Sequence, residues 1–399
     1  MSAVTSIDGI ASQAVETPAT PTDLAKALAA ASRAQLQTVV SGGGTKLDWG
    51  RLPARVDLLL STARLNAIAA HRHGDLTATI QAGASLIDVN QQLAIHGQCL
   101  PIDTPFDGTT IGGMVATNDA GPLRHRYGTP RDLLIGITLA LTDGRIVKAG
   151  GHVVKNVAGY DLGRFMSGSF GTLAAIVDAT FKLLPIPAAS GTVLVRYPNA
   201  LALAKGIDAI RAATLEPTAL DLHVTPPECR LLVRYATSPA ATDAQLAATL
   251  ALVGGDAIVV RGDEERVLWT SHERDVWTKN GAIVRVSWLP ASFADAAAAM
   301  ERIGLATGVR GEQVELVGRA GVGAGLLRID GDDDTQIAAI RQLRGLAPTV
   351  DHVVVLRASR AVKDAVDVWA MPRQLDPIYR SLKRTFDPAG IMNAGRGPI

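Results

Sequence analysis

Residues 104–131 combine glycine and alanine with hydroxyl and amide side chains, a mixture that an ordinary core element does not show. The segment reads TPFDGTTIGGMVATNDAGPLRHRYGTPR and holds few bulky apolar residues. Small residues let the backbone approach a large flat molecule and leave amide N–H groups free to bind it. The segment therefore favours the binding of a cofactor. A single glycine cluster is about as often a set of turns, so neighbouring segments must support this interpretation.

A second glycine cluster, Ser41-Gly42-Gly43-Gly44-Thr45-Lys46, follows a strand-like run at 36–40. Consecutive glycine N–H groups can surround phosphate oxygens, and a lysine adds positive charge. The cluster does not match the P-loop pattern GxxxxGK[ST]. It does not match the dinucleotide pattern GxGxxG either, because residues 47–50 are expected to form a turn rather than a helix. It is a candidate cradle for a pyrophosphate, although on its own such a cluster is more often a turn.

The predicted helices and strands place both glycine clusters in loops. A helix is expected at 21–34, where Thr22 is the predicted N-cap and apolar residues recur at helical spacing. Further strands are expected at 57–61, 77–81 and 173–184, a second helix at 85–96, and a hairpin of 133–142 with 145–148 around Asp143-Gly144. Loops between strands would therefore hold the cofactor.

Pro185 and Pro187 end the last of these strands and precede small residues, which predicts a domain boundary there. We expect a flexible N-terminus at 1–20, a first domain at 21–187, a second at 188–383 and a C-terminal tail at 384–399. The second domain is expected to be an α+β fold, an antiparallel sheet with helices on one face. Its predicted strands are 192–195, 219–224, 230–235, 257–261, 282–288, 314–317 and 326–329, and its predicted helices are 199–212, 241–253, 291–303 and 335–344.

Composition excludes several classes of protein. A net charge of +1 and 4% aromatic residues argue against a nucleic-acid partner. No uncharged run reaches the roughly 18 to 20 residues of a transmembrane helix, and the N-terminus lacks the features of a secretory signal, which predicts a cytoplasmic protein. Cys99 and Cys229 are the only cysteines, whereas an iron–sulfur cluster needs about four thiolates.

The order of these segments, with the loops at 155–162 and 168–173, resembles the FAD-binding domain of the vanillyl-alcohol oxidase flavoprotein superfamily. Within it, GGHVVKNVAGYDLGRFMSGSFGTLAAIVDATFKLLP at 150–185 is most similar to the FAD-binding subunit of bacterial glycolate oxidase. The tail FDPAGIMNAGR at 386–396 is similar to the FDPxGIxNPG ending of glycolate and D-lactate dehydrogenases, with Ala394 where relatives often have proline. The resemblance implies a two-part FAD-binding domain followed by a cap domain.

The resemblance also implies the residues that contact FAD. Ser41 to Lys46 would hold the pyrophosphate, and Ile176 would meet the adenine through its backbone. The remaining residues would lie along the pyrophosphate, the ribityl chain and the ring, or in the glycine loop before Ile176: Thr110, Ile111, Gly112, Gly113, Thr117, Asn118, Gly121 and Gly171. Relatives with covalent flavin use a His or Cys beside these loops. No His lies at 41–46, so non-covalent FAD is expected. His125 is left open as a candidate for covalent attachment of the flavin.

The sequence gives less support for catalytic residues than for cofactor-binding residues. The resemblance makes Asn393 and Arg396 candidates, because the tail returns to the flavin in relatives, and Arg285 could bind a substrate carboxylate. Catalytic relatives carry an HxGDGNxH-like segment that binds a divalent metal, whereas His223, His272 and His352 are isolated here, so no metal is expected. A nicotinamide site at the glycines of 318–325 is rejected, because strand and turn follow where a helix is needed. A loop joining two strands is expected there instead.

The leading hypothesis is an FAD-bearing subunit of a glycolate or other 2-hydroxy acid oxidase complex, which passes electrons to partner subunits. The expected partners are a homologous catalytic flavoprotein subunit and an iron–sulfur subunit, and any contact with the inner membrane would be made through them. One alternative is a self-sufficient FAD-dependent dehydrogenase of the D-lactate type. Another is a structural flavoprotein subunit without catalysis. The sequence does not identify the substrate, the final electron acceptor or the stoichiometry.

Overall fold

The computed structural model describes residues 6–152, 161–226, 228–253, 256–308 and 313–398. The loop motif at 155–162 lies mostly outside these residues. The chain forms two compact units. Unit 1 contains Met1–Ala120, Gly128–Ile186 and Met371–Ile399, and unit 2 contains Gly121–Tyr127 and Pro187–Ala370. Residues 371–383, expected in the second domain, belong to unit 1, and residues 121–127, expected in the first, belong to unit 2.

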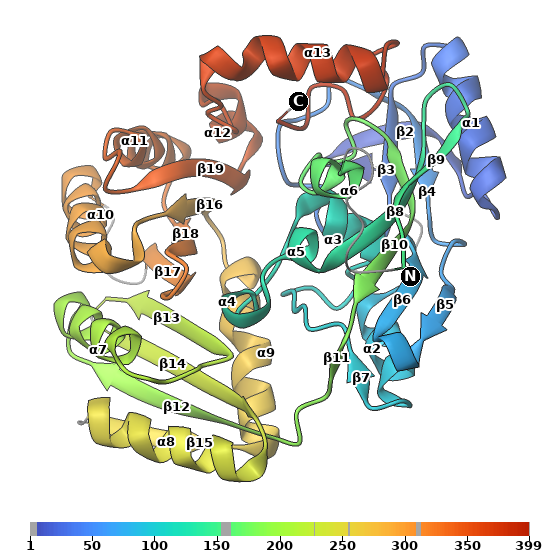
Figure 1. Ribbon diagram of the computed structural model, residues 1–399. Helices are drawn as coiled ribbons and strands as arrows, with labels where there is room; N and C mark the ends of the chain where they lie inside the picture. Colours follow the sequence, from blue (N-terminus) through green and yellow to red (C-terminus); the bar gives the residue numbers. More distant parts are fainter. Residues whose placement is uncertain (1–5, 153–160, 227, 254–255, 309–312, 399) are drawn as a thin grey trace. The chain divides into compact units, whose positions relative to one another are not determined.

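The first sheet of unit 1 has the order β1-β2-β4-β3 (Figure 1). Its strands are β1 (Ser6–Ile7), β2 (Ile10–Glu16), β3 (Thr38–Ser41) and β4 (Val56–Ser61), and both β2 and β3 run parallel to β4. The expectation of a flexible stretch at 1–20 is therefore wrong for β1 and β2. The side chains of β2 are mostly exposed, so its sequence carries no clear apolar alternation, and backbone pairing with β4 is what orders it.

Helix α1 (Pro21–Arg33) packs on this sheet through Leu24 and Leu28. Its N-cap is Thr20, whose hydroxyl accepts a hydrogen bond from the Asp23 N–H at 3.1 Å, and not Thr22 as expected. Proline at the first helical position explains the difference, because proline needs no N–H acceptor there and has φ already fixed for a helix.

The second sheet of unit 1 is antiparallel, with the order β5-β6-β10-β8-β9. Its strands are β5 (Ile68–Arg72), β6 (Thr77–Gln81), β8 (Leu134–Ala140), β9 (Ile146–Gly150) and β10 (Ala175–Lys182), so the expected hairpin is confirmed. Helices α2 (Leu86–Ala94) and α3 (Ile111–Thr117) share its apolar core. The shorter elements are η1 (His73–Asp75), β7 (Gln98–Cys99), α5 (Pro130–Leu133), α6 (Leu162–Met166), β11 (Leu184–Pro185), η4 (Arg373–Leu375) and α13 (Asp376–Phe386).

Unit 2 is built on an eight-stranded sheet with the order β15-β12-β14-β13-β17-β18-β16-β19, and every pairing is antiparallel. The strands are β12 (Ala189–Tyr197), β13 (Ala219–Thr225), β14 (Glu228–Thr237), β15 (Asp256–Val260), β16 (Ala282–Ser287), β17 (Val314–Arg319), β18 (Ala324–Ile329) and β19 (Asp351–Arg357). The α+β antiparallel class is confirmed. Residues 320–323 join β17 to β18, so the glycines there form the expected loop between strands.

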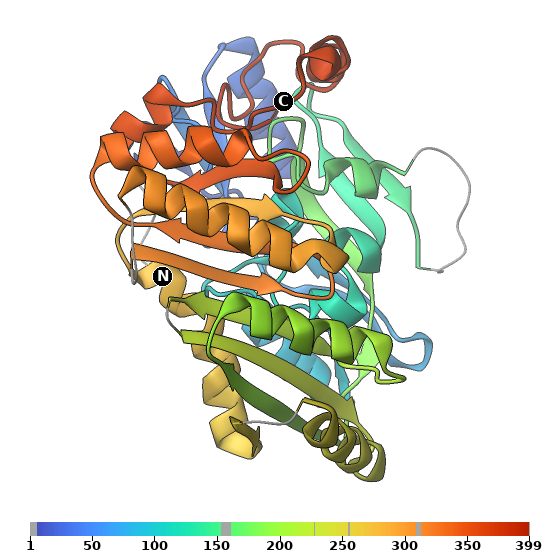
Figure 2. The ribbon, with the colours of Figure 1, turned by 90° about the vertical axis from the view of Figure 1, so that its left-hand side faces the viewer.

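Helices cover both faces of this sheet, where helices on one face were expected. Helices α7 (Ala200–Ala212), α8 (Pro239–Val253), α10 (Phe293–Thr307) and α11 (Asp333–Arg344) form one layer, onto which Figure 2 looks. Helix α9 (Gly262–Thr278) packs on the opposite face through Leu268 and Trp269 (Figure 1). Its sequence, GDEERVLWTSHERDVWT, is so rich in charge that its apolar side is short, and neither α9 nor β19 was predicted. Unit 2 also contains α4 (Arg124–Tyr127), η2 (Pro290–Ser292) and α12 (Arg360–Ala365).

Candidate cofactor site

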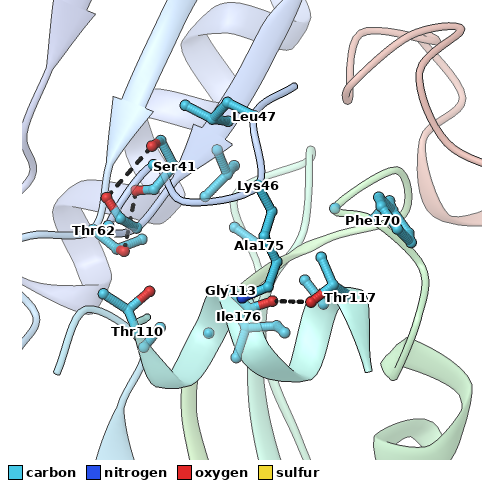
Figure 3. A pocket seen from close by; sticks show the side chains of 18 of the residues that line it. Ser41, Lys46, Leu47, Thr62, Thr110, Gly113, Thr117, Phe170, Ala175 and Ile176 are labelled. Carbon is cyan, nitrogen blue, oxygen red and sulfur yellow. Dashed lines mark hydrogen bonds between the residues drawn. The ribbon is translucent and has the colours of Figure 1, made fainter. Parts of the chain in front are cut away.

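A pocket in unit 1 lies where several elements of that unit end. It contains about 750 Å³ of empty space, counting the part open to solvent. Figure 3 shows the end of β3 and the following glycine loop on one side, and α3 and the start of β10 on the other. The lining residues are Val40 to Leu47, Thr62, Ala82, Thr110, Gly112, Gly113, Ala116, Thr117, Phe170, Gly171, Ala174 to Ile176, Asn393 and Arg396.

The glycine loop after β3 requires glycine for packing reasons. A β-carbon on Gly42 would overlap the Thr110 hydroxyl, and one on Gly43 would overlap the backbone carbonyl of Gly108. Gly44 has a φ of +76°, which favours glycine. In the described part of the chain, the N–H groups of Gly42, Gly43 and Gly44 make no hydrogen bond. The loop therefore presents backbone donors at the pocket, which suits a phosphate group.

Thr110 lies opposite this loop, directly before α3. Its Oγ1 atom is buried and makes no hydrogen bond within the described residues, and its side chain does not cap the helix. An orphaned buried hydroxyl costs free energy unless a partner is supplied, so a bound ligand is a natural partner. Gly112 allows α3 to come close to the second sheet, because a β-carbon there would lie 2.7 Å from Ala82 Cβ. The pocket floor is thus backbone and small side chains.

Lys46 lines the pocket, but its charge is already compensated. The Nζ atom lies 3.2 Å from Asp119 Oδ2 and 3.4 Å from Thr109 Oγ1. It also lies 5.7 Å from the centre of the Trp49 ring and 5.3 Å from that of Phe106. The sequence-based prediction gave this lysine to the pyrophosphate. The structure adds that the ammonium has a buried carboxylate partner, so the backbone of the glycine loop is the better candidate for binding phosphate.

The C-terminal tail forms another wall, and Asp387 shapes it. Its carboxylate accepts hydrogen bonds from the N–H groups of Ile391 and Met392 at 3.2 and 2.8 Å. Lys383 Nζ lies 2.8 Å from the same carboxylate and donates to the carbonyl of Thr172 at 2.6 Å. These contacts fold residues 387–392 into a turn that places the following residues beside β3, where the Thr38 N–H donates to the Ile391 carbonyl at 2.8 Å. The motif FDPAGIMN therefore returns the chain to the pocket.

Asn393 and Arg396 end this wall. The Asn393 side-chain amide donates to the Phe170 carbonyl, and its Oδ1 atom accepts from Arg396 at 3.1 Å. Arg396 is 4% exposed and donates to the carbonyl of Trp49 at 3.0 Å and to that of Leu47. Burial lowers the pKa of its guanidinium to about 10, an effect that Asp8 and Asp48 oppose. Arg396 therefore stays charged at neutral pH and ties the tail to the glycine loop.

Part of unit 1 matches a known family of domains. The family model described as an FAD binding domain matches residues 12–150. Chitooligosaccharide oxidase superimposes with a TM-score of 0.70 at 14% identity, covering 98% of this chain and 92% of that one. Residues 12–150 are therefore an FAD-binding domain, and the solved oxidase has the same fold.

Three curated relatives match about half of the chain or less, whereas an uncharacterized FAD-linked oxidoreductase of Mycobacterium tuberculosis (strain ATCC 25618 / H37Rv), 27% identical, aligns with 95% of it. Glycolate oxidase subunit GlcD of Bacillus subtilis (strain 168) is 34% identical over 209 residues, which are 52% of this chain and 44% of that subunit. Glycolate oxidase subunit GlcE of Escherichia coli (strain K12) is 37% identical over 154 residues, 38% of this chain and 43% of that subunit. D-lactate dehydrogenase of Archaeoglobus fulgidus is 33% identical over 168 residues, 42% of this chain and 38% of that enzyme. These three alignments span less than half of each relative's length.

The pocket in unit 1 brings most of the predicted site residues together. All of Ser41 to Lys46 line the pocket, with Thr110, Gly112, Gly113, Thr117, Gly171 and Ile176. Ile111 instead points into the core, and the Asn118 side chain accepts a hydrogen bond from the Arg131 N–H in α5 at 3.2 Å. Gly121 belongs to unit 2. These three are the residues whose predicted contact with FAD the pocket does not support.

Several lining residues were missed. They include Phe170, together with Thr62, Ala82, Ala116 and Ala174, which have no feature in the sequence that marks them as cofactor contacts. Thr62 follows β4, and its hydroxyl donates to the Ser41 carbonyl at 3.2 Å (Figure 3). Phe170 stands in the left-handed region with a φ of +56° beside Gly171. The sequence signal for Phe170 was its place inside the motif GSFGT.

Unit 2 contains buried charged groups that do not line the pocket. Glu315 accepts from His223 at 2.8 Å and from Arg328 at 3.1 Å, and Asp221 accepts from His272 at 3.1 Å. The histidines of the second half are thus engaged with carboxylates. Arg285 is in β16 and does not line the pocket. Within the described ranges, no group of three or more metal-ligating side chains is suited to a metal ion, and no helix is both long and apolar enough to cross a membrane.

Proposed function

We propose that this chain is the FAD-bearing subunit of an oxidase or dehydrogenase complex acting on glycolate or a related 2-hydroxy acid. The single observation that carries the proposal is the unit 1 pocket, in which unpaired glycine N–H groups face the orphaned Thr110 hydroxyl. The similarity of this same part of the chain to two glycolate oxidase subunits gives the substrate class. A 2-hydroxy acid is also the substrate named for the related D-lactate dehydrogenase.

The pocket residues suggest how FAD is held. The N–H groups of Gly42, Gly43 and Gly44 would bind the diphosphate, and Thr110 would donate its hydroxyl. Arg396 would add a buried positive charge on the same side. Ile176 would contact the adenine through its backbone. When bound, FAD supplies the oxidant that takes two electrons from the α-carbon of a 2-hydroxy acid.

We propose that this FAD is non-covalent. The side chains around the pocket are mostly glycine, alanine, threonine and valine, which do not attach flavin. His125 was left open as a candidate for covalent attachment. It belongs to unit 2, where its ring packs against Gly321. Denaturation of the purified protein should therefore release all of its flavin into the supernatant. Flavin that stays with the denatured chain would contradict this.

We propose further that partner subunits complete the reaction. Two buried histidines of unit 2 are occupied by carboxylates, His223 by Glu315 and His272 by Asp221, so these two are poorly placed to take a proton from a substrate hydroxyl. A homologous flavoprotein subunit would supply the substrate base, and an iron–sulfur subunit would receive the electrons. A cytoplasmic location, with any membrane contact made by partners, follows from the same proposal.

A self-sufficient dehydrogenase is the second candidate, and one observation favours it. Asp221 Oδ1 is buried without a hydrogen-bond partner in the described chain, and so is His125 Nδ1 of the same unit. The Asp221 charge raises the pKa of His125, although burial, the larger effect, lowers it. A histidine near a carboxylate is the type of group that acts as a general base.

Anaerobic reduction of the purified chain separates these functions. The full chain is purified alone, its FAD content is measured, and glycolate or D-lactate is added without oxygen. We expect stoichiometric FAD and little bleaching of the flavin until the partner subunits are added. Rapid bleaching of the isolated chain would establish the self-sufficient dehydrogenase. A protein that cannot take up FAD would overturn the cofactor assignment. If the flavin is not bleached even in the complex, the chain is a structural flavoprotein subunit.

A further inference from the structure

The chain leaves unit 1 after Ala120 and returns to it at Gly128, and the residues between belong to unit 2. We call residues 121–127 the strap. Its two ends are held together within unit 1, where Asn118 Oδ1 accepts a hydrogen bond from the Arg131 N–H at 3.2 Å. Gly128 has a φ of +80°, which favours glycine where the chain returns. The strap is therefore a short loop with a fixed base.

The middle of the strap packs on unit 2. Its helix, α4, lies against β13 of that unit (Figure 1). The His125 ring lies against Gly321, where a β-carbon would overlap the Cε1 and Nδ1 atoms of the ring. The Ala320 N–H donates to the Leu220 carbonyl of β13 at 2.8 Å, which holds this glycine beside the strand. The absence of a side chain at Gly321 thus makes room for the imidazole.

Helix α4 cannot be stable without such contacts. It has four residues, whereas an isolated helix needs roughly 12 to 15 to be even marginally stable in water. The N–H groups of residues 124–127 donate to carbonyls of residues 121–123 at 3.0 to 3.2 Å. Arg126 pairs with Glu216 at 2.9 Å, but both side chains are exposed, and a pair of this kind contributes little. The helix therefore depends on packing against unit 2, to which the His125 ring contributes.

The base of the strap adjoins the pocket of unit 1. Asn118 directly follows α3, whose last residue, Thr117, lines the pocket. Asp119 comes next, and its carboxylate lies 3.2 Å from the Nζ atom of Lys46, another lining residue. A restraint on the strap therefore restrains the end of α3 and the lysine. Conversely, a ligand that orders these pocket residues also restrains the strap.

We propose that docking of the strap on unit 2 and binding of FAD in unit 1 favour each other. The inference rests on the proposed FAD site. Ordering a segment costs conformational entropy, so a cofactor that orders α3 and Asp119 reduces the further cost of ordering the strap. Coupling of this kind is reciprocal, and each event strengthens the other by the same factor, typically about 5- to 150-fold. Through the strap, unit 2 responds to the loading of the cofactor.

Gly321→Ala tests the coupling from the side of unit 2. The new β-carbon overlaps the His125 ring and should undock the strap. The full chain stripped of FAD should then bind added FAD about 5- to 150-fold more weakly than wild type in a fluorescence titration. His125→Ala is the matched background, because it removes the ring that the β-carbon overlaps, and there Gly321→Ala should cause no further loss. Unchanged FAD affinity of Gly321→Ala, or an equal loss in both backgrounds, would overturn the proposal.

Hydrogen exchange of the wild-type chain tests the coupling from the side of unit 1 and requires no variant to fold. The amides of residues 124–127 exchange when α4 opens, so they should exchange more slowly with FAD bound, by the factor found in the titration. The amides of α8, in the same unit, are the control and should exchange equally in both forms.

Two outcomes of the exchange experiment would overturn the role of the strap alone. One is FAD binding without slower exchange at residues 124–127, and the other is equal slowing in α8, which would indicate stabilisation of the whole unit. A chain that takes up no FAD would overturn the cofactor assignment together with the coupling.

Discussion

Lys46 Nζ lies 3.2 Å from Asp119 Oδ2, and the two side chains are only 6% and 11% exposed. The pair joins the end of the glycine loop to the residues after α3, so it connects the two sides of the pocket. A buried ion pair contributes little net stability, because desolvation offsets the attraction, but breaking it leaves an uncompensated buried charge. The role of Lys46 can therefore be separated into a structural part and a cofactor-binding part.

The first prediction addresses that separation. Asp119→Ala should lower the free energy of unfolding by about 3 to 5 kcal/mol, because the Lys46 ammonium loses its buried partner. The double variant Lys46→Met with Asp119→Leu should recover most of that loss, and it should retain FAD if backbone N–H groups bind the diphosphate. Urea unfolding and flavin stoichiometry are the measurements. A stable double variant without FAD would show that Lys46 itself contacts the cofactor.

The second prediction concerns the glycine loop. Gly43→Ala should reduce bound FAD to well below one per chain, because the new β-carbon overlaps the Gly108 carbonyl and must displace the loop. Gly74→Ala is the matched control, since a β-carbon there meets nothing within 4 Å. Flavin absorbance per chain is measured after gel filtration. Full FAD occupancy in Gly43→Ala would move the diphosphate site away from this loop.

The third prediction concerns the turn that returns the tail to the pocket. Asp387→Ala removes the acceptor of the Ile391 and Met392 N–H groups and the partner of Lys383, so the tail should become sensitive to protease and FAD should dissociate faster. Asp376→Ala, at the start of α13, is the control, because its exposed pair with Arg380, at 3.9 Å, should contribute about 0 to 1 kcal/mol. Equal protease resistance of the two variants would contradict the assigned role of Asp387.

The fourth prediction is a pH dependence in unit 2. Burial raises the pKa of Glu315, but hydrogen bonds from His223, Lys279 and Arg328 outweigh it and lower the pKa from 4.5 to about 2. Since the folded-state pKa is the lower one, the stabilisation is present above about pH 4.5 and is lost as pH falls toward 2. A shift of this size corresponds to about 3 kcal/mol.

Glu315→Gln tests this pH dependence. The variant should be less stable than wild type at neutral pH, and the difference should shrink as pH falls from about 4.5 toward 2. The unfolding midpoint in urea, followed at several pH values, gives both curves. A constant difference between the two proteins would mean that Glu315 has the same pKa in the folded and unfolded chains.

Local patterns in the sequence determined much of the FAD-binding domain. The hairpin of β8 and β9 was predicted because Asp143-Gly144 selects a tight turn between alternating strands. The glycine loop at 41–46 was predicted as a phosphate cradle because consecutive glycines leave backbone donors free. Twelve of the fifteen predicted cofactor residues line the pocket: Ser41 to Lys46, Thr110, Gly112, Gly113, Thr117, Gly171 and Ile176. The reason is that conformational demands on glycine and turn residues are local and can be read from a short segment.

Only the tertiary structure decided how distant residues meet. Lys46 with Asp119, Asp387 with the tail N–H groups and β2 with β4 are pairings that no spacing in the chain predicts. Helix α9 was missed because its apolar positions are few and become meaningful only when the sheet covers them. An amphipathic pattern shows that one face of a helix or strand is buried, but it does not show which element packs against that face. The partner of each buried group is fixed by packing in three dimensions, because only there can its charge or hydrogen bond be satisfied.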